Sequence, residues 1–146
     1  MKWVLEFEGY QVKDEIYPLE ITLLNANECY HFLIYYPTDY YSNLTIQYQF
    51  KRHGLSWGEG TETLTSAISQ MQKLISDDDI VFVKGLEKCK MFSSMLPSKH
   101  LVTFDDDKVP SILKLNGYKE ETCEVHKMDF ALCCSRRKAY NLLNYV

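Results

Sequence analysis

Residues 3–37 read WVLEFEGYQVKDEIYPLEITLLNANECYHFLIYYP, and this stretch decides the fold. Three segments in it are rich in aromatic and β-branched residues, and the first alternates apolar with polar positions, which is typical of half-buried strands. Asn25 and Asn27 lie between the second and third segments and favour a tight turn. The sequence therefore predicts an antiparallel meander of three strands, at residues 3–10, 17–25 and 29–37.

Helices and strands alternate after a polar loop that ends near residue 60. Residues 61–76 have helical spacing of apolar side chains, and Thr61 is the predicted N-cap. The apolar positions are Leu64, Ala67, Ile68, Met71, Leu74 and Ile75. The following segments predict a strand buried on both faces, a helix, a second buried strand, a short helix and a final helix, at residues 80–85, 85–96, 100–104, 109–117 and 134–146.

This order of elements predicts an α/β fold of the ribonuclease H-like type. A meander followed by right-handed strand-helix units gives a mixed sheet with helices on its faces. Flavodoxin-like and ferredoxin-like arrangements share parts of the pattern. A length of 146 residues without repeats or a linker predicts a single domain over residues 1–146.

Composition and charge restrict the classes of function. Apolar residues make up 46% and charged residues 25%, which indicates an ordered globular protein. A net charge of −4 does not favour nucleic-acid binding unless basic residues gather locally. Two groups of basic residues do so, although each alone is also typical of a solvated helix face. They are Lys84, Lys88 and Lys90, and Arg136, Arg137 and Lys138.

The N-terminal residues contain no long apolar run, so we expect neither a signal peptide nor a membrane span. We therefore expect an intracellular protein, cytoplasmic or nuclear, with reduced cysteines and no membrane partner. An odd count of five cysteines, with Cys133 beside Cys134, argues against a disulfide framework. Metal binding or simple burial remain, and we expect Cys29 and Cys89 to be buried thiols.

Soft metal donors gather near the C-terminus. Cys123 and His126 are separated by two residues, and Cys134 follows after seven more residues at the start of the predicted last helix. Thiolates and imidazole select zinc over magnesium. The alternative is a set of buried thiols at a helix start. Cys133 competes with Cys134 as the ligand, because adjacent side chains on a helix diverge by about 100°.

The segment from residue 8 to residue 37 resembles the opening of the Maelstrom domain. The resemblance depends on Pro18, Glu20, Ile21, His31, Phe32, Leu33, Ile34 and Pro37. It implies a ribonuclease H-like fold that holds a structural zinc ion with a Glu-Cys-His-Cys set. Here that set is Glu20, Cys123, His126 and Cys134. His31 would either bond a backbone group or support the zinc site from outside the ligand set.

The first strand also resembles that of the DEDD-type 3′-to-5′ exonucleases, which hold two divalent metal ions on carboxylates. Glu6 and Glu8 lie two residues apart and so share a face of the strand. Glu87 stands where the pattern needs its next acid, whereas Asp129 and Cys134 stand where it needs a His and an Asp. Unless Glu6 and Glu8 bind magnesium or manganese, we expect them to be exposed strand residues or the remnant of a lost nuclease site.

The resemblances imply a zinc-stabilised module that binds RNA or proteins in small-RNA silencing, such as the piRNA pathway, or in transposon biology. Single-stranded RNA and protein partners of a silencing complex are the expected ligands, and residual cleavage of single-stranded RNA leaves enzyme status open. A metal-dependent exonuclease and a protein adaptor are the alternatives. Candidate RNA-binding residues are Lys84, Lys88, Lys90, Arg136 and Arg137.

Overall fold

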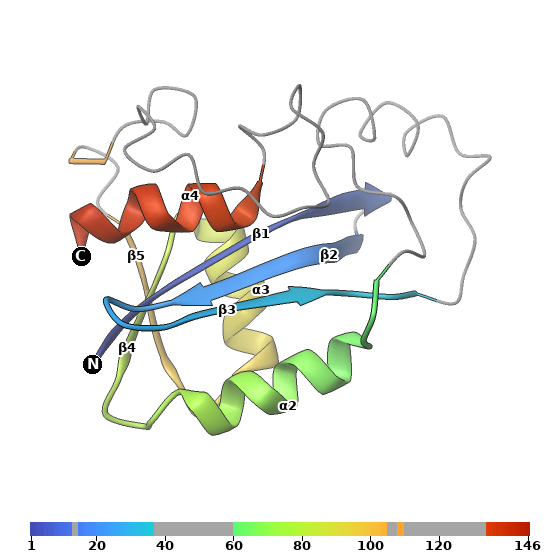
Figure 1. The fold of residues 1–146 in the computed structure, drawn as a ribbon, viewed down its shortest axis with the longest axis horizontal. Helices are drawn as coiled ribbons and strands as arrows, with labels where there is room; N and C mark the ends of the chain where they lie inside the picture. The colour runs from blue at the N-terminus through green and yellow to red at the C-terminus, as the bar shows by residue number, and fades with distance from the viewer. Residues whose placement is uncertain (13–14, 37–59, 105–107, 110–133) are drawn as a thin grey trace.

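A single mixed sheet organises the computed structural model, which describes residues 1–12, 15–36, 60–104, 108–109 and 134–146. Its order is β3-β2-β1-β4-β5 (Figure 1). The meander pairs β1 with β2 and β2 with β3 in antiparallel register, and β1-β4 and β4-β5 are parallel. The strands are β1 (Lys2–Val12), β2 (Glu15–Leu24), β3 (Cys29–Leu33), β4 (Ile80–Val83) and β5 (His100–Thr103).

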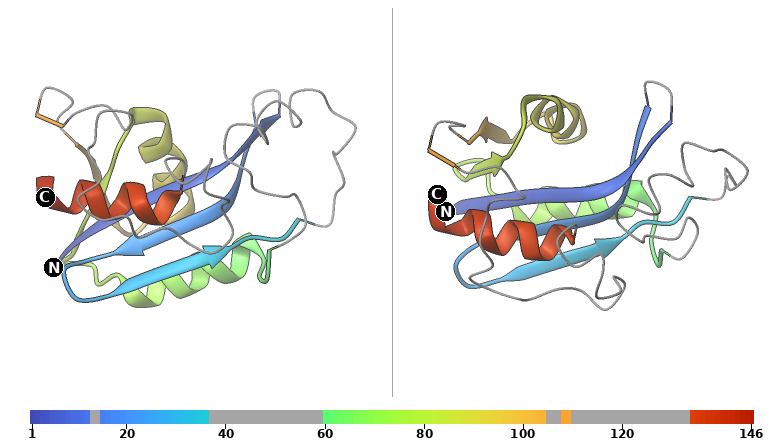
Figure 2. Two further views of the ribbon diagram at one scale, coloured as in Figure 1. Left: turned by 45° about the horizontal axis from the view of Figure 1, so that its top comes forward. Right: turned by 90° about the horizontal axis from the view of Figure 1, so that it is seen from above.

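Helices cover both faces of this sheet. Helix α4 (Ser135–Leu142), which continues into the short 3-10 helix η3 (Leu143–Tyr145), packs on β1 and β2. Helices α2 (Leu64–Leu74) and α3 (Leu86–Met95) lie on the other face (Figures 1 and 2). This strand order, these strand senses and this placement of helices are those of a ribonuclease H-like fold, as the sequence pattern predicts.

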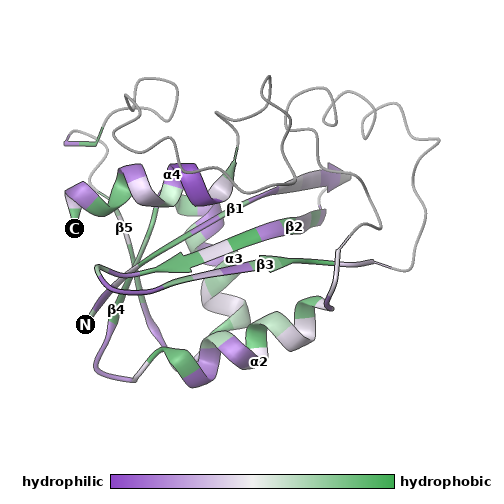
Figure 3. Cartoon of the chain, in the orientation of Figure 1, coloured by the Kyte–Doolittle hydropathy of each residue, from purple (hydrophilic) through white to green (hydrophobic). Residues whose placement is uncertain are grey.

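Alternate residues of β1 enter two separate apolar cores, because successive side chains on a strand point to opposite faces. Trp3, Leu5 and Phe7 pack with α2 and α3, whereas Val4 packs with Leu24 of β2 and with the apolar residues of α4. The next positions of β1 on the α4 face are Glu6 and Glu8, and both are buried. Hydrophilic stretches are visible on both β1 and α4 (Figure 3). The α4 face of the sheet is therefore apolar at one end and charged at the other.

A β-bulge in the meander aligns two of the acidic residues. Glu8 pairs with Glu20 and Gly9 with Pro18, so Leu19 of β2 has no opposite residue. A side chain at position 9 does not fit, since a Cβ atom there would lie 2.1 Å from the carbonyl oxygen of Tyr17. The bulge also accommodates Pro18, which has no N–H for the ladder. As a result Glu8 and Glu20 face α4 side by side.

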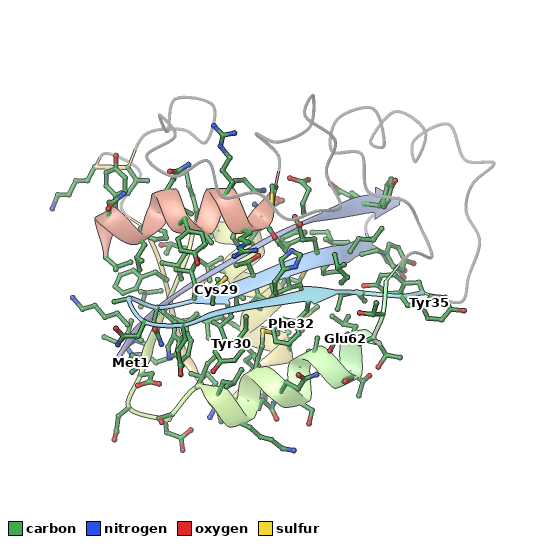
Figure 4. The ribbon with its side chains drawn as sticks, viewed as in Figure 1. Met1, Cys29, Tyr30, Phe32, Tyr35 and Glu62 are labelled. Carbon is green, nitrogen blue, oxygen red and sulfur yellow. The ribbon has the colours of Figure 1, made fainter. Side chains whose placement is uncertain are left out.

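Helix α2 begins two residues later than its sequence pattern predicts. The backbone N–H groups of Thr61 and Glu62 donate to the carbonyl oxygen of Leu33, and Tyr35 N–H donates to Glu62 O at 2.7 Å (Figure 4). These bonds keep residues 61 and 62 extended beside the end of β3. The N-cap is therefore Thr63, whose Oγ1 accepts from Ser66 N–H at 3.1 Å. The prediction of Thr61 as the cap is wrong.

Replacing Thr63 with alanine should lower the free energy of unfolding by about 1 kcal/mol, because one N–H group of the first turn loses its acceptor. Urea denaturation measures the change. Thr61→Ala is the matched control, and we expect it to change the stability by less than half as much, since no side-chain cap is lost there. Equal losses in the two variants would contradict the assignment of the cap.

Other expectations on the helices and strands have mixed outcomes. The apolar spacing of α2 and the presence of a last helix are confirmed, and β4 contributes Val81 and Val83 to one core and Phe82 to the packing of the other. The segment at 100–104 is not a buried strand: β5 lies at the edge of the sheet, and His100 and Thr103 are exposed. The predicted short helix at 109–117 falls outside the described residues, apart from Val109. None of the described helices has the length and apolar character needed to cross a membrane.

Candidate functional site

The carboxylate of Glu20 is the point where β2, β3 and α4 meet. The Glu20 side chain is fully buried. Its Oε1 accepts a hydrogen bond from the backbone N–H of Ser135 at 2.6 Å, and its Oε2 lies 2.9 Å from His31 Nε2. The thiol of Cys134 lies 3.8 Å from the same Oε2 atom. The side chain of Glu20 thus joins the second strand to the last helix. Glu20 and Cys134 are 114 residues apart in the sequence.

Two of the four residues in the zinc set implied by the Maelstrom resemblance are therefore in contact. Cys134 is the N-cap residue of α4 and is buried, with its sulfur toward Glu20. The other two members, Cys123 and His126, lie outside the described residues, as does Cys133. Within the described ranges, no three or more His, Cys, Asp or Glu residues form a metal-binding group by themselves. A complete site would need donors from residues 110–133.

The donor chemistry and the spacing of Glu20 and Cys134 fit a zinc ion. A carboxylate and a thiolate are both common zinc ligands. Two such ligands on one tetrahedral ion are separated by about 3.5 Å, given zinc-oxygen and zinc-sulfur bonds of about 2.0 and 2.3 Å. The separation of 3.8 Å between Sγ and Oε2 is close to this value. Glu20 and Cys134 would hold the ion, which would supply a link between β2 and α4.

His31 contacts Glu20, and its expected support of a zinc site stays a prediction. It lies on β3 opposite Thr22, and its Nε2 faces Glu20 Oε2 and not a backbone group. Donors outside the ligand set orient a ligating carboxylate in many metal sites. Together with Ser135 N–H, His31 fixes both oxygens of Glu20, so the orientation of this carboxylate is set by the fold.

A second cluster lies beside Glu20 and consists of two acids and two lysines. Lys88 of α3 donates from Nζ to Glu6 Oε1 at 2.5 Å. Lys138 of α4 donates to Glu8 Oε2 at 2.9 Å and lies 3.8 Å from Glu6 Oε1. Glu6 is fully buried, and the expectation that Glu6 and Glu8 are exposed strand residues is wrong. The two glutamates share a face, as their spacing predicts, and both face ammonium groups.

The end of strand β4 explains why charged groups enter the fold here. Strand β4 pairs with β1 only as far as Leu5, and no other described strand pairs with β1 on that edge. The backbone groups of Phe7 bond to side chains instead: its N–H donates to Glu6 Oε1 at 3.0 Å and its carbonyl oxygen accepts from Lys138 Nζ at 3.1 Å. The cluster thus provides hydrogen-bond partners for both backbone groups of Phe7 beyond the end of β4.

The charges of the cluster stabilise one another. Burial by itself would raise the pKa of Glu6, but the charges of Lys138 and Lys88 and the hydrogen bonds to this carboxylate hold its pKa below 4.5. Burial by itself would lower the pKa of Lys138, but Glu6 and Glu8 raise it above its ordinary value. Burial lowers the pKa of Lys88, and Glu6 offsets this only in part. The ion pairs therefore favour an ionised Glu6 and a protonated Lys138.

The remaining predicted site residues are not brought into this cluster. Glu87 is exposed on the first turn of α3 and has no hydrogen bond or ion pair to Glu6 or Glu8 in the described part of the chain. Lys90 is exposed, and Lys84, Arg136 and Arg137 are half-buried. Lys88, predicted to contact RNA, is instead engaged with Glu6. Asp129 lies outside the described residues. Cys89 is buried as predicted, whereas Cys29 is only half-buried.

Sequence reasoning missed Lys138 as a site residue and placed it only in a basic patch. One signal was available: Lys138 follows Cys134 by four residues, so both lie on one face of a helix that begins there. The same face carries Ser135, whose hydroxyl lies 2.8 Å from Thr22 Oγ1. A polar layer therefore runs between the sheet and the N-terminal half of α4.

Comparison with known proteins adds no relative. No model of a known protein family matches the sequence, and no curated protein is similar to it. The fold class follows from the topology of the sheet, and the resemblance to the Maelstrom domain stays a prediction.

Proposed function

We propose that this chain is a ribonuclease H-like module of the Maelstrom type that binds single-stranded RNA and does not hydrolyse it by two-metal chemistry. One observation supports this most: the two acids of β1 are ion-paired with lysines inside the fold. Two-metal hydrolysis needs carboxylate oxygens that bind the metal ions. Here ammonium groups from α3 and α4 occupy the oxygens that face them, at 2.5 and 2.9 Å.

A zinc ion shared by Glu20 and Cys134 is part of the same proposal. The resemblance supplies the other two ligands, Cys123 and His126, and four protein ligands leave no open position for a reactive water molecule. Such an ion supplies folding free energy and not catalysis. Its role would be to fix α4 on the meander.

Basic residues on and beside α3 and α4 support RNA as the ligand. Lys88 of α3 and Lys138 of α4 both contact Glu6, so one side chain from each helix reaches the same carboxylate. Helix α3 carries Lys90, α4 carries Arg136 and Arg137, and Lys84 lies between β4 and α3; none of these four is fully buried. Phosphate groups bind lysine and arginine with a strong dependence on salt. A strand of RNA that crosses both helices would meet cationic groups from each. By the resemblance, protein partners would belong to a small-RNA silencing complex.

The direct test incubates end-labelled single-stranded RNA with the protein in magnesium or manganese and measures both retention on a filter and fragment length. We expect RNA that is retained at low salt and keeps its full length. Shortening from the 3′ end that Glu8→Gln abolishes would instead show a two-metal exonuclease. Absence of retention at low salt would favour the protein adaptor.

The basic residues can be tested by exchange of two charges at a time. Lys90→Ala combined with Arg137→Ala should weaken binding and reduce the slope of log affinity against log salt by about 1.4, for two lost phosphate contacts on a single strand. The matched control, Lys2→Ala combined with Lys73→Ala, removes two exposed lysines at the start of β1 and on α2. An equal effect of both pairs would contradict an RNA path over α3 and α4.

A further inference from the structure

The ammonium group of Lys138 lies among three oxygen atoms of β1. They are Glu8 Oε2 at 2.9 Å, the carbonyl oxygen of Phe7 at 3.1 Å and Glu6 Oε1 at 3.8 Å. The Lys138 side chain is only 5% exposed, so these oxygens replace the water that an ammonium group otherwise binds. The Lys138 side chain extends from α4 to β1, where the contact between helix and sheet is polar.

These three oxygens are of the kind that bind hard divalent cations, namely carboxylates and a backbone carbonyl group. The second oxygen of Glu6, Oε2, is buried and accepts no hydrogen bond from the residues that the structure describes. Lys88 provides a second positive charge on Glu6. Two carboxylates and two ammonium groups therefore balance within the fold, and the two cations both belong to the protein chain.

The contact of α4 with the sheet depends on this balance. Ala139 and Leu142 of α4 enter the apolar core on this face and Tyr140 packs against it, all near the C-terminal end of the helix. Its N-terminal half meets the sheet through Ser135 and Lys138. Removal of the ammonium group would leave two buried carboxylates with one counter-charge. This is costly because neither water nor an opposite charge then stabilises the unpaired carboxylate.

We infer that the Lys138 ammonium group is a built-in cation that holds the two carboxylates of β1 together and fixes α4 on the sheet, in the way that a bound metal ion would. The inference depends on the ion pairs alone and holds whether or not RNA binds. It assigns Lys138 as a positioning residue.

The test compares the unmodified protein with Lys138→Ala in buffer freed of divalent cations by resin, with and without millimolar magnesium chloride. Without magnesium, Lys138→Ala should unfold at a lower urea concentration. Hydrogen exchange should show faster exchange of amides in α4, residues 135–142, and little change in α2, residues 64–74. Magnesium should restore part of the lost stability in this variant and leave the unmodified protein unchanged. The variant Lys138→Ala/Glu8→Gln should not respond to magnesium, since one of the two carboxylates that would bind the ion has lost its charge.

A second variant keeps the inference testable if Lys138→Ala does not fold. The triple variant Glu6→Gln/Glu8→Gln/Lys138→Met removes the two acids together with their shared cation, and it should unfold at a higher urea concentration than Lys138→Met alone. An unchanged urea midpoint for Lys138→Ala, an equal response of variant and unmodified protein to magnesium, or a triple variant no more stable than Lys138→Met would each overturn the inference.

Discussion

Replacing Cys134 with serine should lower the free energy of unfolding by several kcal/mol, the largest effect that we expect from any single exchange of a cysteine in this chain. In a structural zinc site the binding free energy of the metal is folding free energy, and serine is a poor zinc ligand. The thiol of Cys134 is fully buried at the start of α4, where it faces Glu20. Loss of the ion would therefore loosen the last helix from the meander.

The matched control is Cys89→Ser, which changes a buried thiol in α3 that packs in the apolar core of α2 and α3. This variant should lose only about 1 to 2 kcal/mol of unfolding free energy, because a buried serine hydroxyl without a hydrogen-bond partner replaces the thiol. Urea denaturation of both variants gives the comparison. Cys134→Ser and Cys89→Ser of equal stability would contradict a metal-binding role for Cys134.

Replacing Glu6 with glutamine should cost about 3–5 kcal/mol at neutral pH, because it leaves the buried Lys138 and the partly exposed Lys88 with one counter-charge. Glu6 is fully buried, so solvent does not screen this loss. The exchange keeps the size and shape of the side chain, and the loss therefore reports charge and not packing. Urea denaturation at pH 7 measures it.

The same carboxylate should make the stability depend on pH. The pKa of Glu6 in the folded state lies below 4.5, the value for an unfolded chain, so the folded state binds the proton less readily. The contribution of Glu6 to stability is therefore complete above pH 4.5 and is lost as the pH falls through the folded-state pKa. Glu6→Gln should lose less stability than the unmodified protein over this range. Parallel pH profiles of the two proteins would contradict the assignment.

The sequence predicts the elements of the fold well wherever side-chain periodicity determines them. The alternation of Trp3, Leu5 and Phe7 places β1, and the spacing of Ala67 and Met71 places the buried face of α2. It fails at the start of α2, because Thr61 and Thr63 are equally good caps locally. The choice between them depends on backbone bonds to Leu33, which is distant in the sequence.

The candidate site is predictable only in part. The spacing of Glu6 and Glu8 shows that they share a face, but nothing local shows that the face is buried under a helix 130 residues later in the sequence. Glu20 is singled out by the family resemblance alone, whereas the gathering of soft donors near the C-terminus also marks Cys134. The donor that fixes Glu20 Oε1 is the backbone N–H of Ser135, which no sequence pattern marks.

The most direct measurement of the central claim is the metal content of the unmodified protein, purified without added metal and without a metal-binding tag. Elemental analysis should give one zinc ion per chain, because the account has Glu20 and Cys134 share a tetrahedral ion with two further soft donors. A folded protein that contains no zinc, or one that contains magnesium or manganese in its place, would contradict the account.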